Sequence, residues 1–234
     1  MSDYSRPAVP PRRRERPNLK QEVGVYLRDQ ILSGALRPGD KIDQDTTAAE
    51  LGVSKLPVRE ALITLETEGL VENVARRGSF VSPLVPDDVL DHYAIYGLVA
   101  GLAAERAATR LSDEDLEDLE RLAHKMETSD HPAEQEELNF QFHQLINKAG
   151  SSRRLLSVIR LLANNMPRQF FEFAADWPKR AHQDHRRIIA ALRSRDAAAA
   201  ARATTDHLRE GGQYAVRVLR EGGLWSDDEA DLRP

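Results

Sequence analysis

The sequence has no cysteine among its 234 residues. This absence excludes disulfides, thiolate metal sites and cysteine nucleophiles, and any transition-metal site must use histidine, carboxylate or amide ligands. Long hydrophobic runs are missing too, because the longest apolar or glycine run, residues 93–104, falls short of the ~18 residues of a membrane span. Three arginines at 12–14 stand where a signal peptide would need an apolar core. We therefore expect a cytoplasmic protein that does not enter the membrane.

The chain as a whole also lacks an excess of basic charge. Lys plus Arg number 33 and Asp plus Glu 38, and this net charge of −5 excludes a globally basic nucleic-acid coat. The charges are unevenly placed, since residues 1–82 carry 13 basic and 12 acidic side chains and the remainder carries 20 and 26. The N-terminal part is thus net +1 and the rest −6, which places the basic excess at the N-terminus.

The composition divides the chain into five parts. Residues 1–18 hold four prolines and five arginines, which predicts a disordered basic arm, either a simple tail or a source of extra phosphate contacts. Residues 19–82 and 87–222 show regular periodicity and form the two predicted domains, joined by a proline-containing linker at 83–86. Residues 223–234 form an acidic tail, which we expect to be frayed from Trp225 onward.

Residues 19–82 show the pattern of three short helices. A helical period begins at Leu19, a second helix ends near Leu51, and a third reaches about Glu68. Residues typical of helix ends stand at the boundaries, namely Gly34, Asp43, Gly52 and Ser54. The Ser54 side chain is expected to accept a hydrogen bond from the first free amides of the third helix. The second and third helices therefore form a helix-turn-helix.

Two short β-type runs, 70–74 and 79–81, follow the third helix and flank a basic tip. A hairpin directly after a helix-turn-helix predicts a winged helix, in which the third helix enters a DNA major groove and the wing reaches the flanking backbone. Beyond the linker the pattern is helical throughout, with an expected break at Pro167. Six helices with short connections predict an antiparallel bundle, at about 87–109, 112–128, 133–149, 152–173, 179–194 and 196–220. The expected fold class is thus mostly α.

The segment at 51–62, LGVSKLPVREAL, together with Gly69-Leu70-Val71 and Arg77-Gly78, resembles the GntR family of bacterial transcription regulators. The C-terminal part resembles the FCD ligand-binding domain of the FadR subfamily. Its matching residues are Asn139-Phe140-Gln141-Phe142-His143, Asp184-His185 and His207. The resemblance covers the chain from Leu19 to about Leu219.

The resemblance implies a set of DNA-contacting residues: Ser54, Lys55, Leu56, Arg59, Arg76, Arg77 and Gly78. Arg59 would face the groove as a base or phosphate contact, unless it is simply a solvated helix charge, and the last three would form the wing. The family usually has arginine then threonine after the capping serine, where this chain has Lys55 and Leu56. Lysine cannot make the planar two-pronged contact that arginine makes to guanine, so the operator of relatives should not be transferred to this protein.

Three histidines on three helices are expected to point into the bundle. His143 borders the apolar stripe of its helix, with Asn139 one turn before it, and His185 and His207 are in register with the apolar residues of their own helices. With a turn near Arg195, a rise of ~1.5 Å per residue puts these two roughly 15 Å and 18 Å from the turn, so the imidazoles can meet. The remaining histidines are weaker candidates: His92, His124 and His131 are expected to be exposed, and His182 to lie outside the ligands.

Three inward histidines with an adjacent amide oxygen suit a divalent first-row metal, and zinc or nickel more than manganese. The resemblance implies the same positions as ligands, Asn139, His143, His185 and His207, with a metal near the effector. The family more often has aspartate where this chain has Asn139, so the site should be less negative and open to an anionic ligand. An arginine of the first bundle helix commonly faces the effector in the family. This chain has Tyr96 there, which offers a hydroxyl and a ring to the effector pocket.

These features predict a homodimeric repressor that binds a palindromic operator and responds to a small metabolite, such as an organic or sugar acid. The apolar run at 97–104 is a candidate dimer interface or a central core helix. One alternative is a regulator for which the metal ion itself is the signal. A histidine-metal hydrolase or lyase is another, although we expect no enzyme, because Asp184 should point away from His185 and leave no general base beside the histidines.

Overall fold

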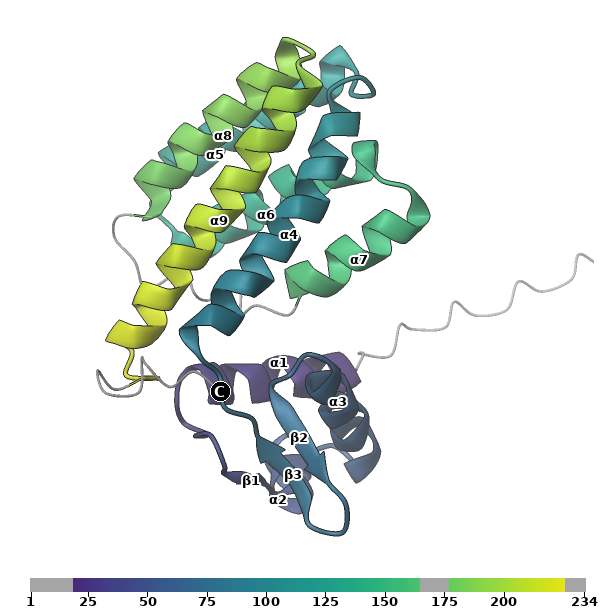
Figure 1. Ribbon diagram of the computed structural model, residues 1–234, viewed down its shortest axis with the longest axis vertical. Coiled ribbons are helices and arrows are strands. Elements are labelled where there is room, and N and C mark those ends of the chain that lie inside the picture. The colour runs from purple at the N-terminus through teal and green to yellow at the C-terminus, as the bar shows by residue number, and fades with distance from the viewer. Residues whose placement is uncertain (1–18, 165–176, 226–234) are drawn as a thin grey trace, which may run out of the picture.

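The computed structural model describes residues 19–164 and 177–225, which form an N-terminal winged-helix unit and a helical bundle (Figure 1). The elements of the winged-helix unit are α1 (Leu19–Leu32), β1 (Lys41–Ile42), α2 (Gln44–Glu50), α3 (Lys55–Thr67), β2 (Val71–Val74) and β3 (Gly78–Val81). Those of the bundle are α4 (Pro86–Ala107), α5 (Asp113–Thr128), α6 (Pro132–Gly150), α7 (Arg153–Asn164), α8 (Trp177–Arg193) and α9 (Ala197–Glu221). The expected arm at 1–18, the break at Pro167 and the tail beyond Trp225 lie outside the described residues.

Turn residues end the first helices at the predicted places. Gly34 and Gly52 adopt φ of 75° and 63°, a left-handed conformation that glycine tolerates without strain. Asp43 caps α2, since its Oδ1 accepts from the amides of Asp45 and Thr46 at 2.9 and 2.8 Å. The cap expected from Ser54 was wrong, because Ser54 has extended backbone at the start of α3 but its side chain makes no capping hydrogen bond.

The hairpin was predicted, but the sheet has a third strand. The strand order is β1-β3-β2, all antiparallel, with Ile42 opposite Ser79 and Val71 opposite Val81. A strand of two residues carries no readable alternation, and β1 exists because β3 has a free edge beside it. One face of the sheet packs on a core shared with α1 and α3, formed by Val23, Leu27, Ile31, Val58, Leu62, Leu65, Val71 and Val81.

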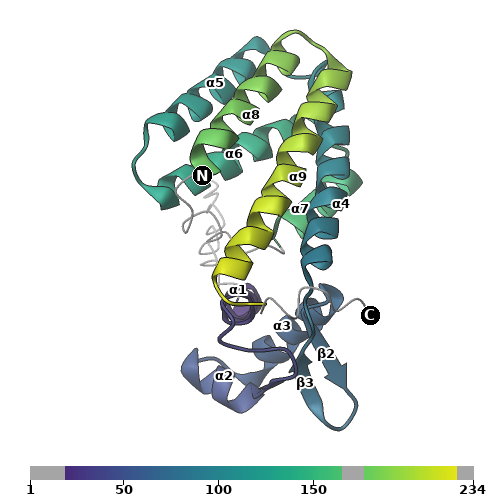
Figure 2. The same ribbon diagram turned by 60° about the vertical axis from the view of Figure 1, so that its left-hand side comes forward.

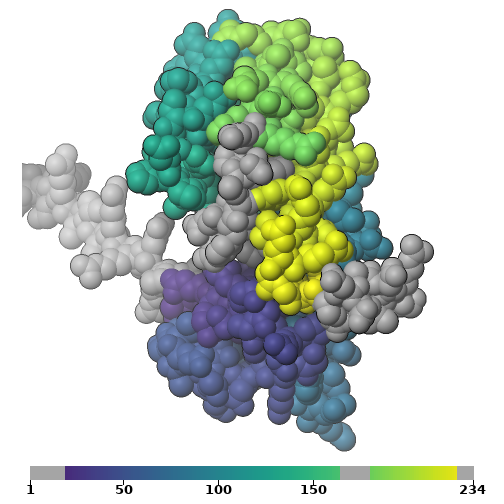
Figure 3. Space-filling model, turned by 90° about the vertical axis from the view of Figure 1, so that its left-hand side faces the viewer, coloured from purple at the N-terminus to yellow at the C-terminus, as the bar shows by residue number. Residues whose placement is uncertain are grey.

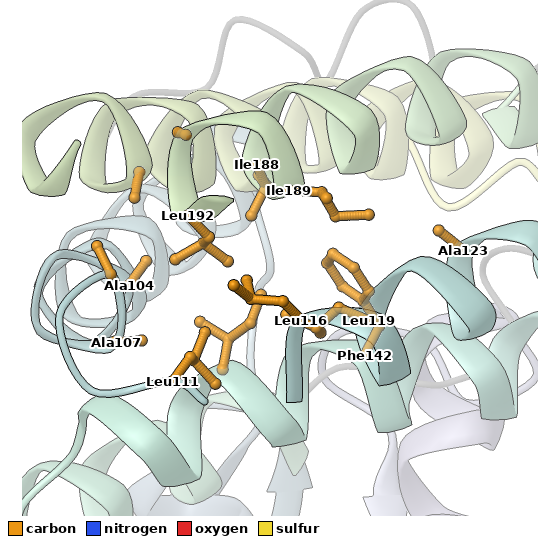
Figure 4. Close-up of a cluster of buried hydrophobic side chains, with 14 of the residues drawn as sticks. Ala104, Ala107, Leu111, Leu116, Leu119, Ala123, Phe142, Ile188, Ile189 and Leu192 are labelled. Atoms are coloured by element: carbon orange, nitrogen blue, oxygen red, sulfur yellow. The ribbon is translucent and has the colours of Figure 1, made fainter. Parts of the chain in front are cut away.

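The bundle helices begin and end close to the predicted residues, apart from the predicted end of the fourth at 173, which lies outside the described residues. Its core gathers apolar side chains from α4, α5, α6, α8 and α9, with Phe142 and Leu119 completely buried at its centre (Figure 4). The long helices α4 and α9 run side by side through the bundle (Figures 1 and 2). Small residues permit their close approach, since a Cβ at Gly212 would lie 2.7 Å from that of Tyr93, and one at Gly97 3.1 Å from the Thr205 carbonyl oxygen. No helix in the described ranges is both long and apolar enough to span a membrane.

The C-terminal end of α9 returns to the winged-helix unit. Figure 3 shows the yellow end of this helix lying against purple α1. The contact is a set of buried residues that we term the junction cluster: Leu32, Val89, Tyr93, Ala215, Val216, Leu219 and Trp225. Fraying at Trp225 was a wrong prediction, because its side chain is only 7% exposed and its Nε1 donates to the Leu84 carbonyl at 2.6 Å. The interdomain linker is therefore bonded to a residue four positions beyond the end of α9.

Candidate DNA-recognition surface and histidine site

Helix α3 has one buried face and one outward face. Val58, Leu62 and Leu65 pack into the core of the winged-helix unit. The outward side chains follow the complementary helical spacing and are Lys55, Leu56, Arg59, Glu60 and Ile63, all exposed. The residues that were predicted to contact DNA from this helix therefore lie at the surface, in its first two turns. This is the part of a recognition helix that contacts base edges.

The wing places two arginines at its tip. Arg76 adopts φ of 64° and Gly78 φ of 112°, which closes the tight turn between β2 and β3. Both arginine side chains are exposed, and the guanidinium of Arg77 lies 5.6 Å from the centre of the Phe80 ring. The wing tip is directed away from the bundle (Figures 1 and 2). Contacts of these residues with DNA remain a prediction.

A buried ion pair, which the sequence analysis did not identify, fixes α3 to α1. The Nε and Nη2 atoms of Arg28 donate to the two carboxylate oxygens of Glu68 at 2.8 and 2.9 Å. Their side chains are 10% and 3% exposed, and Glu68 is the residue that ends α3. Gly24 lies beside the guanidinium, and a Cβ there would be 3.8 Å from Nη2. The sequence contains one signal for this pair, because Arg28 lies among the apolar residues on the buried face of α1.

The three predicted histidines converge from three helices. His143 comes from α6, His185 from α8 and His207 from α9, and one ring nitrogen of each lies within 4.8 Å of the others. The Nε2 atoms of His143 and His207 are 3.2 Å apart, with the two rings stacked at 5.1 Å between centroids. The predicted facing of these side chains is thus confirmed.

Burial keeps His143 and His185 in the neutral form that binds metals. Desolvation, and secondarily the neighbouring His207, lower the pKa of His143 to about 3, and burial lowers the pKa of His185 well below its ordinary value. His185 is 1% exposed, and neither of its ring nitrogens has a hydrogen-bond partner among the described residues. An unpartnered buried polar group costs about 1–3 kcal/mol, which a bound ion or ligand would offset. The three histidines therefore fit a divalent cation in ligand type and spacing.

The prediction for Asp184 was wrong. It was expected to leave no acid beside the histidines, but it is 5% exposed and its Oδ2 lies 3.5 Å from Nδ1 of His207. The flank of α8 that carries Asp184 is covered by α9, and no periodicity of α8 alone contains that information. A carboxylate beside Nδ1 favours a proton on that nitrogen and leaves Nε2 of His207 as the lone-pair donor toward the cluster. Asp184 also accepts from Arg187 at 3.0 Å.

The other histidines divide into two groups. His124 and His131 are exposed, as predicted. The prediction for His92 was wrong, because its ring is half-buried between α4 and α7 and its Nε2 lies 3.1 Å from the Leu162 carbonyl oxygen. His182 is half-buried and close enough to His185 to lower the pKa of that ring further.

Tyr96 lies in a polar layer of the bundle interior. Burial raises its pKa to about 12, against a hydrogen bond with the Asn147 side chain that lowers it. Asn147 is 6% exposed and stands one turn after His143 on α6, so the same spacing that singled out Asn139 could have identified it. Thr204, one turn before His207 on α9, is 2% exposed, and its hydroxyl has no hydrogen-bond partner within the described part of the chain. Asn139 is half-buried, and its role as a ligand remains a prediction.

A surface groove elsewhere in the bundle is distinct from the histidine site. Its volume is about 740 Å³ and it runs between α5 and α6. The lining residues are mostly charged or polar, among them Arg121, Lys125, Glu137 and Lys148, and include none of the three histidines. The buried cluster is therefore the better candidate for a ligand site.

Comparison with known proteins gives two family matches. Residues 19–81 match the family described as bacterial regulatory proteins, gntR family, and residues 91–210 match the FCD domain. An uncharacterised HTH-type transcriptional regulator of Mycobacterium tuberculosis is 31% identical over 152 residues, which span 65% of this chain but only 62% of that protein. The HTH-type transcriptional repressor RspR of Escherichia coli is 26% identical over 216 residues, 90% of this chain and 95% of that protein. The structure of E. coli McbR/YncC has the same fold, with a TM-score of 0.64 and 22% identity over 87% of this chain and 97% of that one.

Proposed function

Because the chain belongs to the GntR family of bacterial regulatory proteins and carries a C-terminal FCD domain, we propose that it is a DNA-binding transcription repressor. Its operator affinity is controlled by a small metabolite that binds beside a metal in the bundle. The observation that carries this function is the outward face of α3, which presents Lys55, Leu56 and Arg59 next to a wing tipped by two arginines. Repression is supported by the E. coli relative that is named a repressor.

The DNA contact is tested by replacing Arg59 with alanine. Since its side chain is exposed, the variant should fold normally but lose about 1–3 kcal/mol of operator binding. The duplex is obtained by selection from a random pool with the full chain, and binding is measured by fluorescence anisotropy. Arg209→Ala, an exposed arginine of α9, serves as the control. Unchanged affinity in Arg59→Ala would contradict the groove assignment.

The metal is held by His143, His185 and His207, with Asn139 as a fourth ligand. Zinc and nickel suit this neutral nitrogen-rich set better than manganese. When bound, the ion supplies a positive charge that attracts a carboxylate of the effector. Asp184 orients His207 by accepting from Nδ1, and the protonated phenol of Tyr96 offers a hydroxyl to the effector together with Asn147. These groups favour an organic acid or sugar acid, which combines a carboxylate with hydroxyls.

Metal content tests the ligand set. The purified chain should contain a divalent ion by elemental analysis, and His143→Ala/His207→Ala should contain little, whereas the exposed His124→Ala should keep wild-type occupancy. Equal occupancy in all three proteins would argue against the ligands. Thermal shift with organic and sugar acids then identifies the effector, because a ligand of the native state raises its apparent stability. If metal alone released DNA and no acid had an effect, the ion itself would be the signal.

The chain acts as a homodimer on a palindromic operator, since one recognition helix supplies few base contacts. An exposed apolar face supports this, formed by Ile95, Leu98 and Leu102 of α4 and by Val158 and Leu161 of α7. The glycines of the run at 97–104 face α9 instead, so only its outer residues belong to the interface.

Sedimentation equilibrium tests the dimer. A charge introduced by Leu98→Glu, a residue that is 59% exposed, should give monomers. Val25→Glu, an exposed apolar residue of α1, should stay dimeric. A wild-type chain that sediments as a monomer at micromolar concentration would refute the interface.

Effector control requires that the ligand bind two arrangements of the winged helices with different affinity. Helix α9 provides the physical connection, because it carries His207 in the bundle and contributes Ala215, Val216 and Leu219 to the junction cluster. A displacement of α9 at the histidine site would therefore reach α1 and the linker.

A further inference from the structure

Leu56 has the largest exposed fraction of the big apolar side chains in the described part of the chain, at 64%. It lies in the first turn of α3, between the exposed Lys55 and the buried Pro57. Single exposed leucines are common on protein surfaces, but this one stands on the turn that a recognition helix presents to base edges. Its position is rigid, because Pro57 and Val58, the residues that follow it, are buried.

The side chains around Leu56 are poorly suited to the phosphate backbone. Lys55 forms an ion pair with Asp45 of α2 at 2.5 Å, so part of its charge is already compensated. Glu60, one turn after Leu56 and on the same face, would be repelled by a phosphate. Arg59 is the other cation of this face, and it is flanked by apolar Leu56 and acidic Glu60. Such a combination matches base edges better than a row of phosphates.

The major groove offers one apolar group to a protein, the C5-methyl of thymine. A leucine on this turn can bury its methyl groups against that group, whereas a G·C pair presents only polar groups and no methyl. We propose that Leu56 is a specificity-determining residue that contacts a thymine methyl in each operator half-site. This inference rests on the proposed DNA-binding function and adds the base that the first turn of α3 selects.

The test uses operators selected from a random duplex pool by the full wild-type chain. Each thymine of the selected half-site is then replaced, one at a time, by deoxyuridine, which removes only the C5-methyl. At one position the substitution should weaken wild-type binding roughly fourfold per half-site, the value of one buried methyl group. Leu56→Ala should bind the thymine operator more weakly than wild type and should not respond to deoxyuridine at that position.

Ile63→Ala is the matched control. Ile63 is 61% exposed on the same face of α3 but two turns further along, about 10 Å from Leu56 at the rise of a helix. This variant should keep the full response to deoxyuridine. Circular dichroism checks that both variants fold, which their exposure leads us to expect.

Three results would overturn the proposal. Two of them refute only the contact of Leu56 with a thymine methyl, and the third refutes sequence-specific DNA binding as well. Selected duplexes that wild type binds equally well with every thymine replaced would refute the methyl contact alone. A response to deoxyuridine that persists in Leu56→Ala would assign the methyl to another residue. A pool from which no sequence is enriched would refute sequence-specific DNA binding itself, and this proposal with it.

Discussion

At the scale of single residues, the Arg28–Glu68 pair has the largest energetic consequence. Both charges are buried in the winged-helix unit and hydrogen-bonded through two parallel contacts. Arg28→Met removes the guanidinium and both of its hydrogen bonds from the buried Glu68 carboxylate, and it should therefore cost about 3–5 kcal/mol of unfolding free energy. Urea denaturation followed by circular dichroism measures it.

The double variant Arg28→Met/Glu68→Leu separates the value of the pair from the cost of burying the Glu68 carboxylate without Arg28. Because apolar residues of similar volume often replace a buried pair at little cost, the double variant should regain most of the lost stability. A double variant as unstable as Arg28→Met alone would show that the ion pair itself stabilises the contact between α1 and α3.

His92 should make stability depend on pH. Burial lowers its pKa from 6.5, while the Leu162 carbonyl, which accepts from its Nε2, opposes the shift. The unfolded chain then takes up a proton at higher pH than the folded one. The stabilisation linked to this group is complete above pH 6.5 and is lost as the pH falls from there toward the folded-state pKa.

The variant His92→Gln keeps an N–H donor for the carbonyl and removes the titration. The unfolding free energies of both proteins are measured in urea between neutral and mildly acidic pH. The free energy by which wild type exceeds His92→Gln should become smaller as the pH falls. The other histidines are common to both proteins and cancel in this difference. A difference that stays constant with pH would mean that the ring titrates normally in the fold.

At the scale of elements, periodicity predicted what lies within one helix and missed what a distant partner supplies. The three histidines were found because helical spacing gives the facing of each side chain, and the turn near Arg195 gives the heights of two of them. Asp184 was misplaced because its burial depends on the packing of α9 against α8. His92 was misplaced for a similar reason, since its partner Leu162 lies 70 residues away. Strand β1 is too short to have a period.

The crossing of α4 and α6 depends on Gly150, the last residue of α6. A Cβ at this position would overlap the backbone carbonyl of Ala103, which cannot move without displacing α4. Gly150→Ala should therefore destabilise the chain by about 1–3 kcal/mol, despite the better helix propensity of alanine. Thermal unfolding by calorimetry measures the effect.

Gly24→Ala gives the matched comparison, because a Cβ there meets nothing closer than 3.8 Å and the residue lies inside α1. That variant should be as stable as wild type or more so, by up to ~1 kcal/mol. Equal stability changes in the two glycine variants would contradict the argument from close helix contact.

At the scale of the whole molecule, the net charge of the winged-helix unit differs from the net charge of residues 1–82. Residues 19–82 carry eight basic and ten acidic side chains, so the +1 of residues 1–82 depends on the five arginines before Leu19. The winged-helix unit therefore presents local cations, Arg59 and the two wing arginines, on a net acidic background. Such a surface favours selective contacts over general attraction to DNA.

The junction cluster should transmit the state of the histidine site to the winged helices. Trp225 stands just beyond α9 and belongs to the same buried cluster as Leu32 of α1, and its indole N–H donates to the Leu84 carbonyl in the linker. It therefore connects the helix that carries His207 to both α1 and the linker. Replacing it with alanine should leave metal content unchanged but abolish most of the change in operator affinity that metal or effector produces. Affinity is measured by fluorescence anisotropy with metal and after chelation.

Trp225→Phe, which fills the space but lacks the indole N–H, should retain part of the response, because packing and the hydrogen bond both contribute. If Trp225→Ala bound DNA with the same metal dependence as wild type, the signal would have to pass through α4 and the linker alone.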